Sequence, residues 1–259
     1  MRKLLLTTFG LAAAIALAAG GESTPSTTTS ASAGSCTKAD LTLKNAGTLT
    51  VGTDNPAFPP WFGGGEKAAP WKINDPASGE GFESAVVYAV AEKLGFDRAD
   101  VKWTVVPFDK AFAPGPKDFD LLANQVSINP ERAQNVTFSS GYYNVNQAVV
   151  ALDGTPIAAA KTLADLKPYK FGAQVGTTSL SAIEERVGPD KDVAVYNNQD
   201  DAVNALENKQ VDGIVVDLPT GFFVTAAQIE GSKIVGQFPQ GTGTPEQFGL
   251  VILLHTYIM

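Results

Sequence analysis

Short apolar runs alternate along the chain with segments in which apolar residues recur at helical spacing. Residues 48–53 are typical of a strand, with Leu49 and Val51 on one face. Residues 213–216 form a continuous apolar run, which is typical of a strand buried on both faces. Strands that alternate with helices in this way predict an α/β fold.

Three helices are predicted from the spacing of apolar residues. The residues expected to face inward are Phe82, Val86, Ala89, Val90 and Leu94 in the first, Ala202, Val203, Ala205 and Leu206 in the second, and Phe222, Phe223, Ala226 and Ile229 in the third. Pro219 suits the first turn of the third helix. A further helix is expected to begin at Asn129, which would cap it, and to place Arg132 in its first turn.

The N-terminal segment is typical of an export signal followed by a tether. Residues 1–19 combine Arg2 and Lys3 with an apolar run, which predicts a signal peptide. Gly20 stands where a lipoprotein processing box would carry its lipid-bearing cysteine. Residues 20–45 are rich in Ser and Thr and predict a flexible tether that holds the protein near a membrane.

Composition excludes several kinds of site. The formal net charge is −8, which argues against nucleic acid as a partner because nucleic acid requires a basic surface. The chain has one histidine, His255, and one cysteine, Cys36, so a Ser-His-Asp triad or a Cys/His metal site is not expected. We expect no catalytic residues, no metal and no cofactor.

Polar residues follow the predicted strands. Asp54 comes after the first strand, Thr177 and Thr178 follow a strand over 170–175, and Asp217 follows 213–216. Backbone N–H groups and hydroxyls at a strand-to-helix turn suit an anion, but a Thr there also caps a helix. Asp217 is likewise either a ligand for a cation or a cap for the helix that Pro219 opens.

Several sequence blocks resemble, in order, those of the periplasmic solute-binding proteins for polar amino acids (family 3), the substrate-binding proteins of ABC transporters. The blocks are Thr53-Asp54, Phe58-Pro59-Pro60-Trp61-Phe62, Gly81-Phe82-Glu83, Ser127-Ile128-Asn129-Pro130-Glu131-Arg132-Ala133, Phe138-Ser139, Tyr142-Tyr143, Asp165-Leu166-Lys167, Gly176-Thr177-Thr178, Val211-Asp212-Gly213 and Asp217. The resemblance extends from about Leu49 to Leu253. Glu83 replaces the more common Asp, and Asn129 the more common Thr.

The resemblance implies a two-lobed periplasmic binding protein fold of type II, in which each lobe is a mixed sheet flanked by helices. Lobe 1 would comprise 46–143 and 240–259, and lobe 2 would comprise 148–238. Two hinge strands, near 141–147 and 238–244, would join them and allow the cleft to close. Members usually continue with two further helices, so the C-terminus of lobe 1 is expected to be truncated.

The resemblance also implies a site for a zwitterion. Arg132 would grip the carboxylate with two charge-assisted bonds, Thr177 and Thr178 would close on it from lobe 2, and Asp217 would receive the ammonium. Asp54 is a second acidic candidate. The remaining candidates are the wall residues Phe58, Trp61 and Phe82, and the polar residues Asn124, Gln125, Ser127 and Gln174.

These expectations define two alternative functions. The first is an exported, periplasmic or cell-surface monomer that binds a free amino acid (glutamine, glutamate or similar) for an ABC transporter permease. The alternative is an enzyme on the same fold, a dehydratase similar to cyclohexadienyl dehydratase, in which Glu83 or Asp54 would serve as acid or base.

Overall fold

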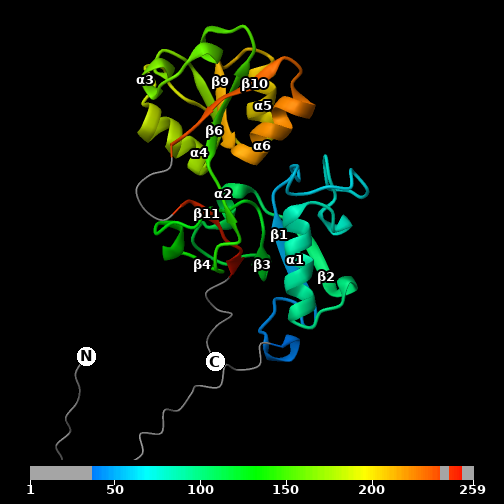
Figure 1. The fold of residues 1–259 in the computed structure, drawn as a ribbon. Helices are drawn as coiled ribbons and strands as arrows, with labels where there is room; N and C mark the ends of the chain where they lie inside the picture. The colour runs from blue at the N-terminus through cyan, green and yellow to red at the C-terminus, as the bar shows by residue number, and fades with distance from the viewer. Residues whose placement is uncertain (1–36, 240–244, 253–259) are drawn as a thin grey trace, which may run out of the picture. The chain divides into compact units, whose positions relative to one another are not determined.

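The computed structural model describes residues 37–239 and 245–252 (Figure 1). These residues form two five-stranded sheets with flanking helices and one two-stranded ribbon. The predicted signal peptide, Gly20, Cys36 and His255 lie outside the described residues.

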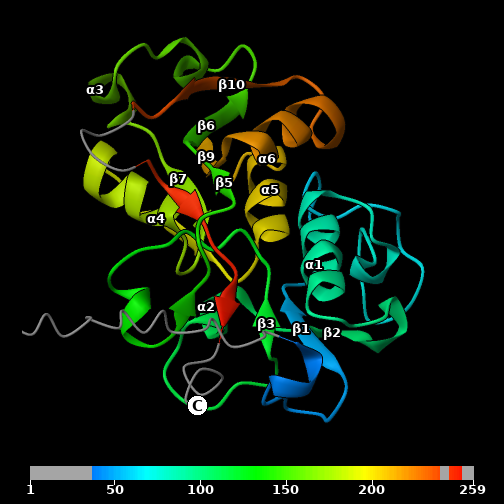
Figure 2. The same ribbon diagram turned by 60° about the horizontal axis from the view of Figure 1, so that its bottom comes forward.

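The first sheet has the strand order β2-β1-β3-β12-β4. Its strands are β1 (Leu49–Thr53), β2 (Val101–Val105), β3 (Leu121–Leu122), β4 (Thr137–Phe138) and β12 (Val251–Ile252). β1 runs parallel to β2 and β3, whereas β12 is antiparallel to β3 and β4. Helix α1 (Phe82–Lys93) lies along this sheet, and the short helix α2 (Phe108–Ala111) follows β2 (Figure 2).

The second sheet has the strand order β10-β6-β9-β7-β8. Its strands are β6 (Gln147–Leu152), β7 (Phe171–Gln174), β8 (Ala194–Tyr196), β9 (Gly213–Asp217) and β10 (Ser232–Gln237). The helices around it are α3 (Leu163–Leu166), α4 (Thr178–Ser181), α5 (Gln199–Glu207) and α6 (Leu218–Phe223) (Figure 1). β9 is parallel to β7 and antiparallel to β6.

The chain leaves the first sheet, builds the second and then returns. After β10 it pairs β11 (Gln247–Phe248) with β5 (Tyr143–Asn144), and β12 then inserts between β3 and β4. Lobe 1, the first sheet with its helices, is therefore discontinuous, and lobe 2 is a single insert. This is the two-lobed α/β architecture that the sequence predicts.

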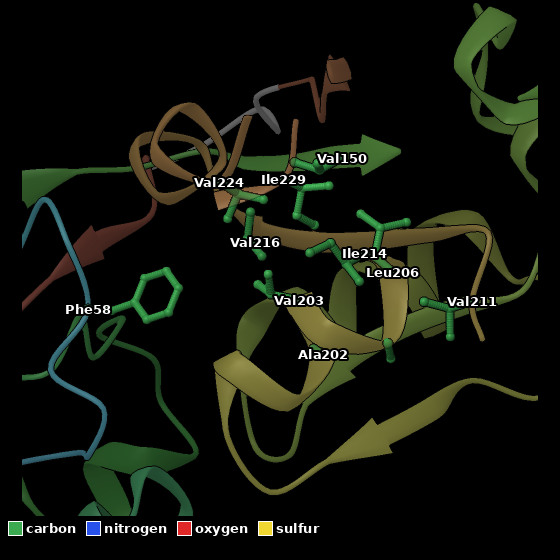
Figure 3. Packing of buried hydrophobic residues seen from close by; sticks show 11 residues of the cluster. Phe58, Val150, Ala202, Val203, Leu206, Val211, Ile214, Val216, Val224 and Ile229 are labelled. Atoms are coloured by element: carbon green, nitrogen blue, oxygen red, sulfur yellow. The ribbon is translucent and has the colours of Figure 1, made fainter. Parts of the chain in front are cut away.

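Alternating side chains of the second sheet pack on its two faces. Val150, Ile214 and Val216 pack with α5 and the segment after α6 (Figure 3). Val149 and Val215 pack on the other face with the residues around α3 and α4. Helices thus cover both faces, as the apolar run at 213–216 indicates.

The sequence predictions hold best in lobe 2. The four predicted inward residues of α5 (Ala202, Val203, Ala205 and Leu206) are all buried. The predicted face of the third helix is partly wrong, because Phe222 and Ala226 are exposed while Thr220, Gly221 and Val224 are buried.

Lobe 1 departs further from the predictions. The buried face of α1 carries Glu83, Val87 and Ala91, whereas Phe82 and Ala89 are exposed. Val86, Val90 and Leu94, which were also predicted to face inward, are partly buried against the same core. The predicted helix at Asn129 is only a short turn, Arg132–Gln134, although Asn129 Oδ1 does accept a hydrogen bond from the Arg132 N–H, at 2.8 Å.

Of the apolar run near residues 119–126, only Leu121–Leu122 pairs as a strand. Part of the predicted tether is packed, because Leu41 and Leu43 lie against the core cluster that α1 contacts. Residues that precede the predicted start of lobe 1 at residue 46 thus contribute to its packing.

Gly81, at the start of α1, adopts a conformation that a larger residue would find strained. Its φ is +91°, and a Cβ there would stand 2.5 Å from Phe62 Cα and Trp61 O. We expect Gly81→Ala to lower the free energy of unfolding by about 2–5 kcal/mol, through backbone strain and overpacking together. Chemical denaturation measures this loss. Gly236→Ala is the control, since a Cβ at Gly236 meets nothing within 4 Å, and an equal loss in both variants would contradict the prediction.

Candidate functional site

A cavity lies where the two lobes meet. Its lining residues are Asp54, Pro56, Phe58, Phe108, Asn124 and Gln125 from lobe 1, and Gln174, Thr177, Thr178, Ser179, Asn198, Gln199, Asp217 and Thr220 from lobe 2. Its volume is about 50 Å³, a third of the roughly 150 Å³ that accommodates benzene in an engineered protein cavity. An amino acid therefore requires the lobes or their side chains to move apart from these positions.

Asp217 brings a carboxylate to the cavity from the end of β9. It is the N-cap residue immediately before α6, yet its side chain makes no capping bond. Instead it accepts a hydrogen bond from Gln147 Nε2 at 2.8 Å. Burial, together with the neighbouring carboxylates of Glu246 and Glu83, raises the pKa of Asp217 to about 8. The side chain of Asp217 therefore does not cap α6. Its carboxylate faces the cavity, and no described cation bonds to it.

Glu83 lies behind the cavity wall and is fully buried. Its carboxylate accepts hydrogen bonds from the Gln125 N–H at 2.7 Å, from Gln125 Nε2 and from the Tyr142 hydroxyl. Burial raises the pKa of Glu83 to about 7 in spite of these three donors. Gln125 has a positive φ of 48°, so Glu83 holds a cavity residue in an unusual backbone conformation.

Asp54 contributes the second carboxylate of the lining, from the end of β1. Its Oδ1 accepts from the Asn55 N–H and its Oδ2 accepts from Gln174 Nε2, both at 2.8 Å. The bond to Gln174 joins lobe 1 to lobe 2. Burial raises the pKa of Asp54, and the nearby Asp109 adds to this effect.

Unpartnered amide groups also line the cavity. Asn124 Nδ2 and Gln199 Nε2 are buried without a hydrogen-bond partner. Such donors are costly unless they are paired, so they indicate a position for an acceptor such as a carboxylate. Thr177 caps α4 by accepting from the Leu180 N–H, and its hydroxyl donates to Gln174 O. Thr178 Oγ1 accepts from Gln147 Nε2 at 3.2 Å.

Arg132 lies beside this cavity rather than in its wall. Its Nη1 donates to Ser127 O at 2.7 Å, and its Nη2 donates across the lobes to Gly176 O at 2.8 Å. The guanidinium stands 4.4 Å from the centre of the Phe112 ring. Burial lowers the pKa of Arg132 to about 10, and Glu246 and Asp217 oppose that shift. The guanidinium is therefore in the electrostatic field of Asp217, while its hydrogen bonds go to backbone carbonyls.

An adjoining cavity of about 260 Å³ contains Arg132 and shares Thr177 and Thr178 with the first. The two cavities thus meet along the start of α4. The positive potential expected from a helix at Arg132 is absent, since only one short turn forms there.

Of the predicted site residues, those brought together in the cavity are Asp54, Phe58, Asn124, Gln125, Gln174, Thr177, Thr178 and Asp217. Trp61 is buried nearby and donates from Nε1 to Thr220 Oγ1 at 3.0 Å. Ser127 donates to Glu246 Oε1 at 2.6 Å. Phe82 is 41% exposed and lies against Trp61 and Tyr143 outside the cavity.

Sequence reasoning missed six residues of the lining: Pro56, Phe108, Ser179, Asn198, Gln199 and Thr220. Asn198 had a detectable signal, because it caps α5 by accepting from the Asp201 N–H at 2.9 Å. Capping residues at the start of a helix that faces a cleft are reasonable candidates. Glu246, which lies beside Gln147 and Ser127, gave no local signal.

The part of the chain that the structure describes has no helix long and apolar enough to cross a membrane. The same residues contain no cluster of three His, Cys, Asp or Glu side chains suited to a metal ion.

Comparison with known proteins identifies a family. Residues 49–215 match the bacterial extracellular solute-binding proteins, family 3. The chain is 29% identical over 139 residues to the ABC transporter arginine-binding protein 1 of Escherichia coli (strain K12), which covers 53% of this chain and 54% of that protein. It is 28% identical over 149 residues to the ABC transporter glutamine-binding protein GlnH of Bacillus subtilis (strain 168), with 56% and 53% covered. The chain thus spans about half the length of the curated relatives it matches.

Solved structures share the fold over a longer stretch. An ancestral arginine-binding protein bound to arginine is similar with a TM-score of 0.63 and 29% identity, over 80% of this chain and 85% of that one. The arginine-, lysine-, histidine-binding protein ArtJ of Geobacillus stearothermophilus has a TM-score of 0.65 at 24% identity, over 81% and 84% of the two chains. These likenesses confirm the two-lobed type II fold.

The raised pKa of Asp217 predicts how stability depends on pH. The folded protein holds this proton more firmly than the unfolded chain, so the stabilisation is full below about pH 4 and is lost as the pH rises through about 8. The loss is up to about 1.4 kcal/mol per pH unit. Asp217→Asn has no carboxyl group to ionise and so lacks this pH-dependent loss of stability. The variant should therefore gain thermal stability relative to the parent as the pH rises from 5 to 9.

Thermal unfolding without added amino acid, at pH 5, 7 and 9, measures this effect. Asp118→Asn is the control, since the side chain of Asp118 is 89% exposed. A difference between Asp217→Asn and the parent that stays constant across the pH range would refute the assigned cause.

Proposed function

The chain belongs to the bacterial extracellular solute-binding proteins of family 3, and we propose that it binds one free amino acid between its lobes for delivery to an ABC importer. The single observation that supports this most is the composition of the cavity wall. Two carboxylates, Asp54 and Asp217, and two unpartnered amides, Asn124 and Gln199, face the same small space from both lobes.

This set of groups matches the two ends of an amino acid. Asp217 would receive the ammonium, which replaces the cation that its buried carboxylate lacks. The α-carboxylate of the ligand would accept hydrogen bonds from the amide donors and from the start of α4. There the cavity adjoins the second cavity, which contains Arg132. Arg132 would exchange its hydrogen bond to Gly176 O for one to the ligand, and its side chain would have to move to do so.

The family supports a proposal for the partner and the location. An ABC permease is the proposed partner, and the proposed location is periplasmic or at the cell surface. The tether and the signal peptide predicted from the sequence fit this location. The protein is proposed to act as a monomer.

The dehydratase alternative depends on an acid or base that touches the substrate. Asp54 lines the cavity, but Glu83 does not, because its oxygens face Gln125 and Tyr142. The relatives named above are binding proteins. Turnover of a cyclic dienyl acid by the purified protein would favour the alternative.

Thermal unfolding with each of the twenty amino acids tests the proposal. A ligand at a hundred times its dissociation constant adds about 2.7 kcal/mol to the stability of the folded protein, which is about 5–10 °C for a chain of this size. We expect such a shift with at least one amino acid. A folded sample that shifts with none of them would overturn the proposal.

Removal of the Arg132 guanidinium should weaken ligand binding severely. Loss of one member of a buried charged set costs roughly 3–5 kcal/mol, or about two to four decades in the dissociation constant. Titration calorimetry of Arg132→Ala measures the change. Arg98→Ala is a matched control, because Arg98 also donates to a backbone carbonyl, Ala77 O, and also lies over an aromatic ring, Tyr88, but away from the cavity. A loss below threefold in Arg132→Ala would contradict its role.

A further inference from the structure

The charges around the cavity are unbalanced. Asp54 and Asp217 line it, and no described lysine, arginine or histidine does. Two more carboxylates stand directly behind its walls, since Glu83 bonds to Gln125 and Glu246 is within hydrogen-bonding reach of Gln147. Four carboxyl groups therefore surround the site, and a bound cation favours their ionised forms, whereas burial favours the protonated forms of Asp217 and Glu83.

The described cation whose field acts on Asp217 is Arg132, and its bonds are already made to Ser127 O and Gly176 O. A zwitterion with a neutral side chain brings one positive and one negative charge, so it leaves the excess of negative charge around the cavity unchanged. An acidic amino acid would increase it. Only a ligand with a second positive charge reduces it, and buried charge without a partner is strongly unfavourable.

Asp54 is placed to meet such a second charge. Its carboxylate has three hydrogen-bond donors nearby, from Asn55, Gln174 and Phe108, yet all are neutral. It makes no ion pair with any described residue. Phe58 and Phe108 line the same cavity as Asp54, and aromatic rings near a carboxylate are a favourable environment for a guanidinium or ammonium group.

From this arrangement, and resting on the proposed function, we infer that the ligand is an amino acid with a cationic side chain, which Asp54 binds while Asp217 binds the α-ammonium. The unpartnered amides of Asn124 and Gln199 are left for the carboxylate. This differs from the glutamine or glutamate expected from the sequence. Glutamine satisfies hydrogen bonds at Asp54 but adds no positive charge, so the two ligands are separable by experiment.

The test compares amino acids of matched shape and different charge. Titration calorimetry at low salt is run with L-arginine against L-citrulline, in which an oxygen replaces one guanidinium nitrogen, and with L-lysine against L-glutamine. We expect the tighter cationic ligand to bind at least tenfold more tightly than its neutral counterpart. A neutral member that binds as tightly as, or more tightly than, the cationic one overturns the inference while the proposed function stands. No binding of any amino acid overturns the proposed function itself.

The variant Asp54→Asn tests whether Asp54 is the residue that causes the preference for a cationic side chain. It should reduce arginine affinity at least tenfold and change citrulline affinity by less than threefold, so that the preference for charge collapses. Asp109→Asn is the matched control, because it removes the same charge close to Asp54 but outside the cavity lining, where Asp109 pairs with Lys110 at 2.8 Å. An arginine-to-citrulline ratio that Asp54→Asn leaves unchanged also overturns the inference, and circular dichroism establishes that both variants are folded.

Discussion

The cost of burying carboxylates without a cation is the constraint on which this site depends. Burial raises the pKa of Asp217, and the carboxylates of Glu246 and Glu83 add to this effect, whereas the hydrogen bond from Gln147 and the charge of Arg132 oppose it. In such a cluster a ligand ammonium does more than add a contact, because it restores the charge that the closed cleft lacks. Binding and closure are then coupled, since the ligand favours the state in which the carboxylates are most deeply buried.

The fold brings these groups together through strand ends. Asp54 directly follows β1 in lobe 1 and Asp217 ends β9 in lobe 2. Ligands of open α/β sheets bind beyond the carboxyl ends of strands. Each lobe supplies one carboxylate and one unpartnered amide to the cavity. Neither lobe alone forms the site, so the choice between ligands depends on groups that meet only when the two lobes are together.

The sequence predicted those features that follow from local periodicity or from the ends of strands. The inward face of α5 and the positions of Asp54, Thr177 and Asp217 are of this kind. It failed where long-range contacts override the local pattern. Glu83 is buried because Gln125 and Tyr142, about 42 and 59 residues away in the chain, donate to it, and no periodicity shows that. Phe82 was expected in the wall, but the same rotation of α1 that buries Glu83 leaves Phe82 exposed.

Direct contacts between the lobes explain why the cavity is small. Phe58 of lobe 1 packs edge-to-face on Phe223 of lobe 2, with ring centroids 5.8 Å apart, and Trp61 donates to Thr220. Gln174 bonds to Asp54 and Arg132 bonds to Gly176 in the same interface. The last two bonds use the very side chains proposed to hold the ligand. Protein groups and ligand thus compete for the same partners, so the ligand must offer Asp54 and Arg132 more than a neutral amide and a carbonyl do. Charged partners meet this condition, because they add an attraction between opposite charges that a neutral amide or carbonyl cannot supply, and this attraction is strong where water is excluded.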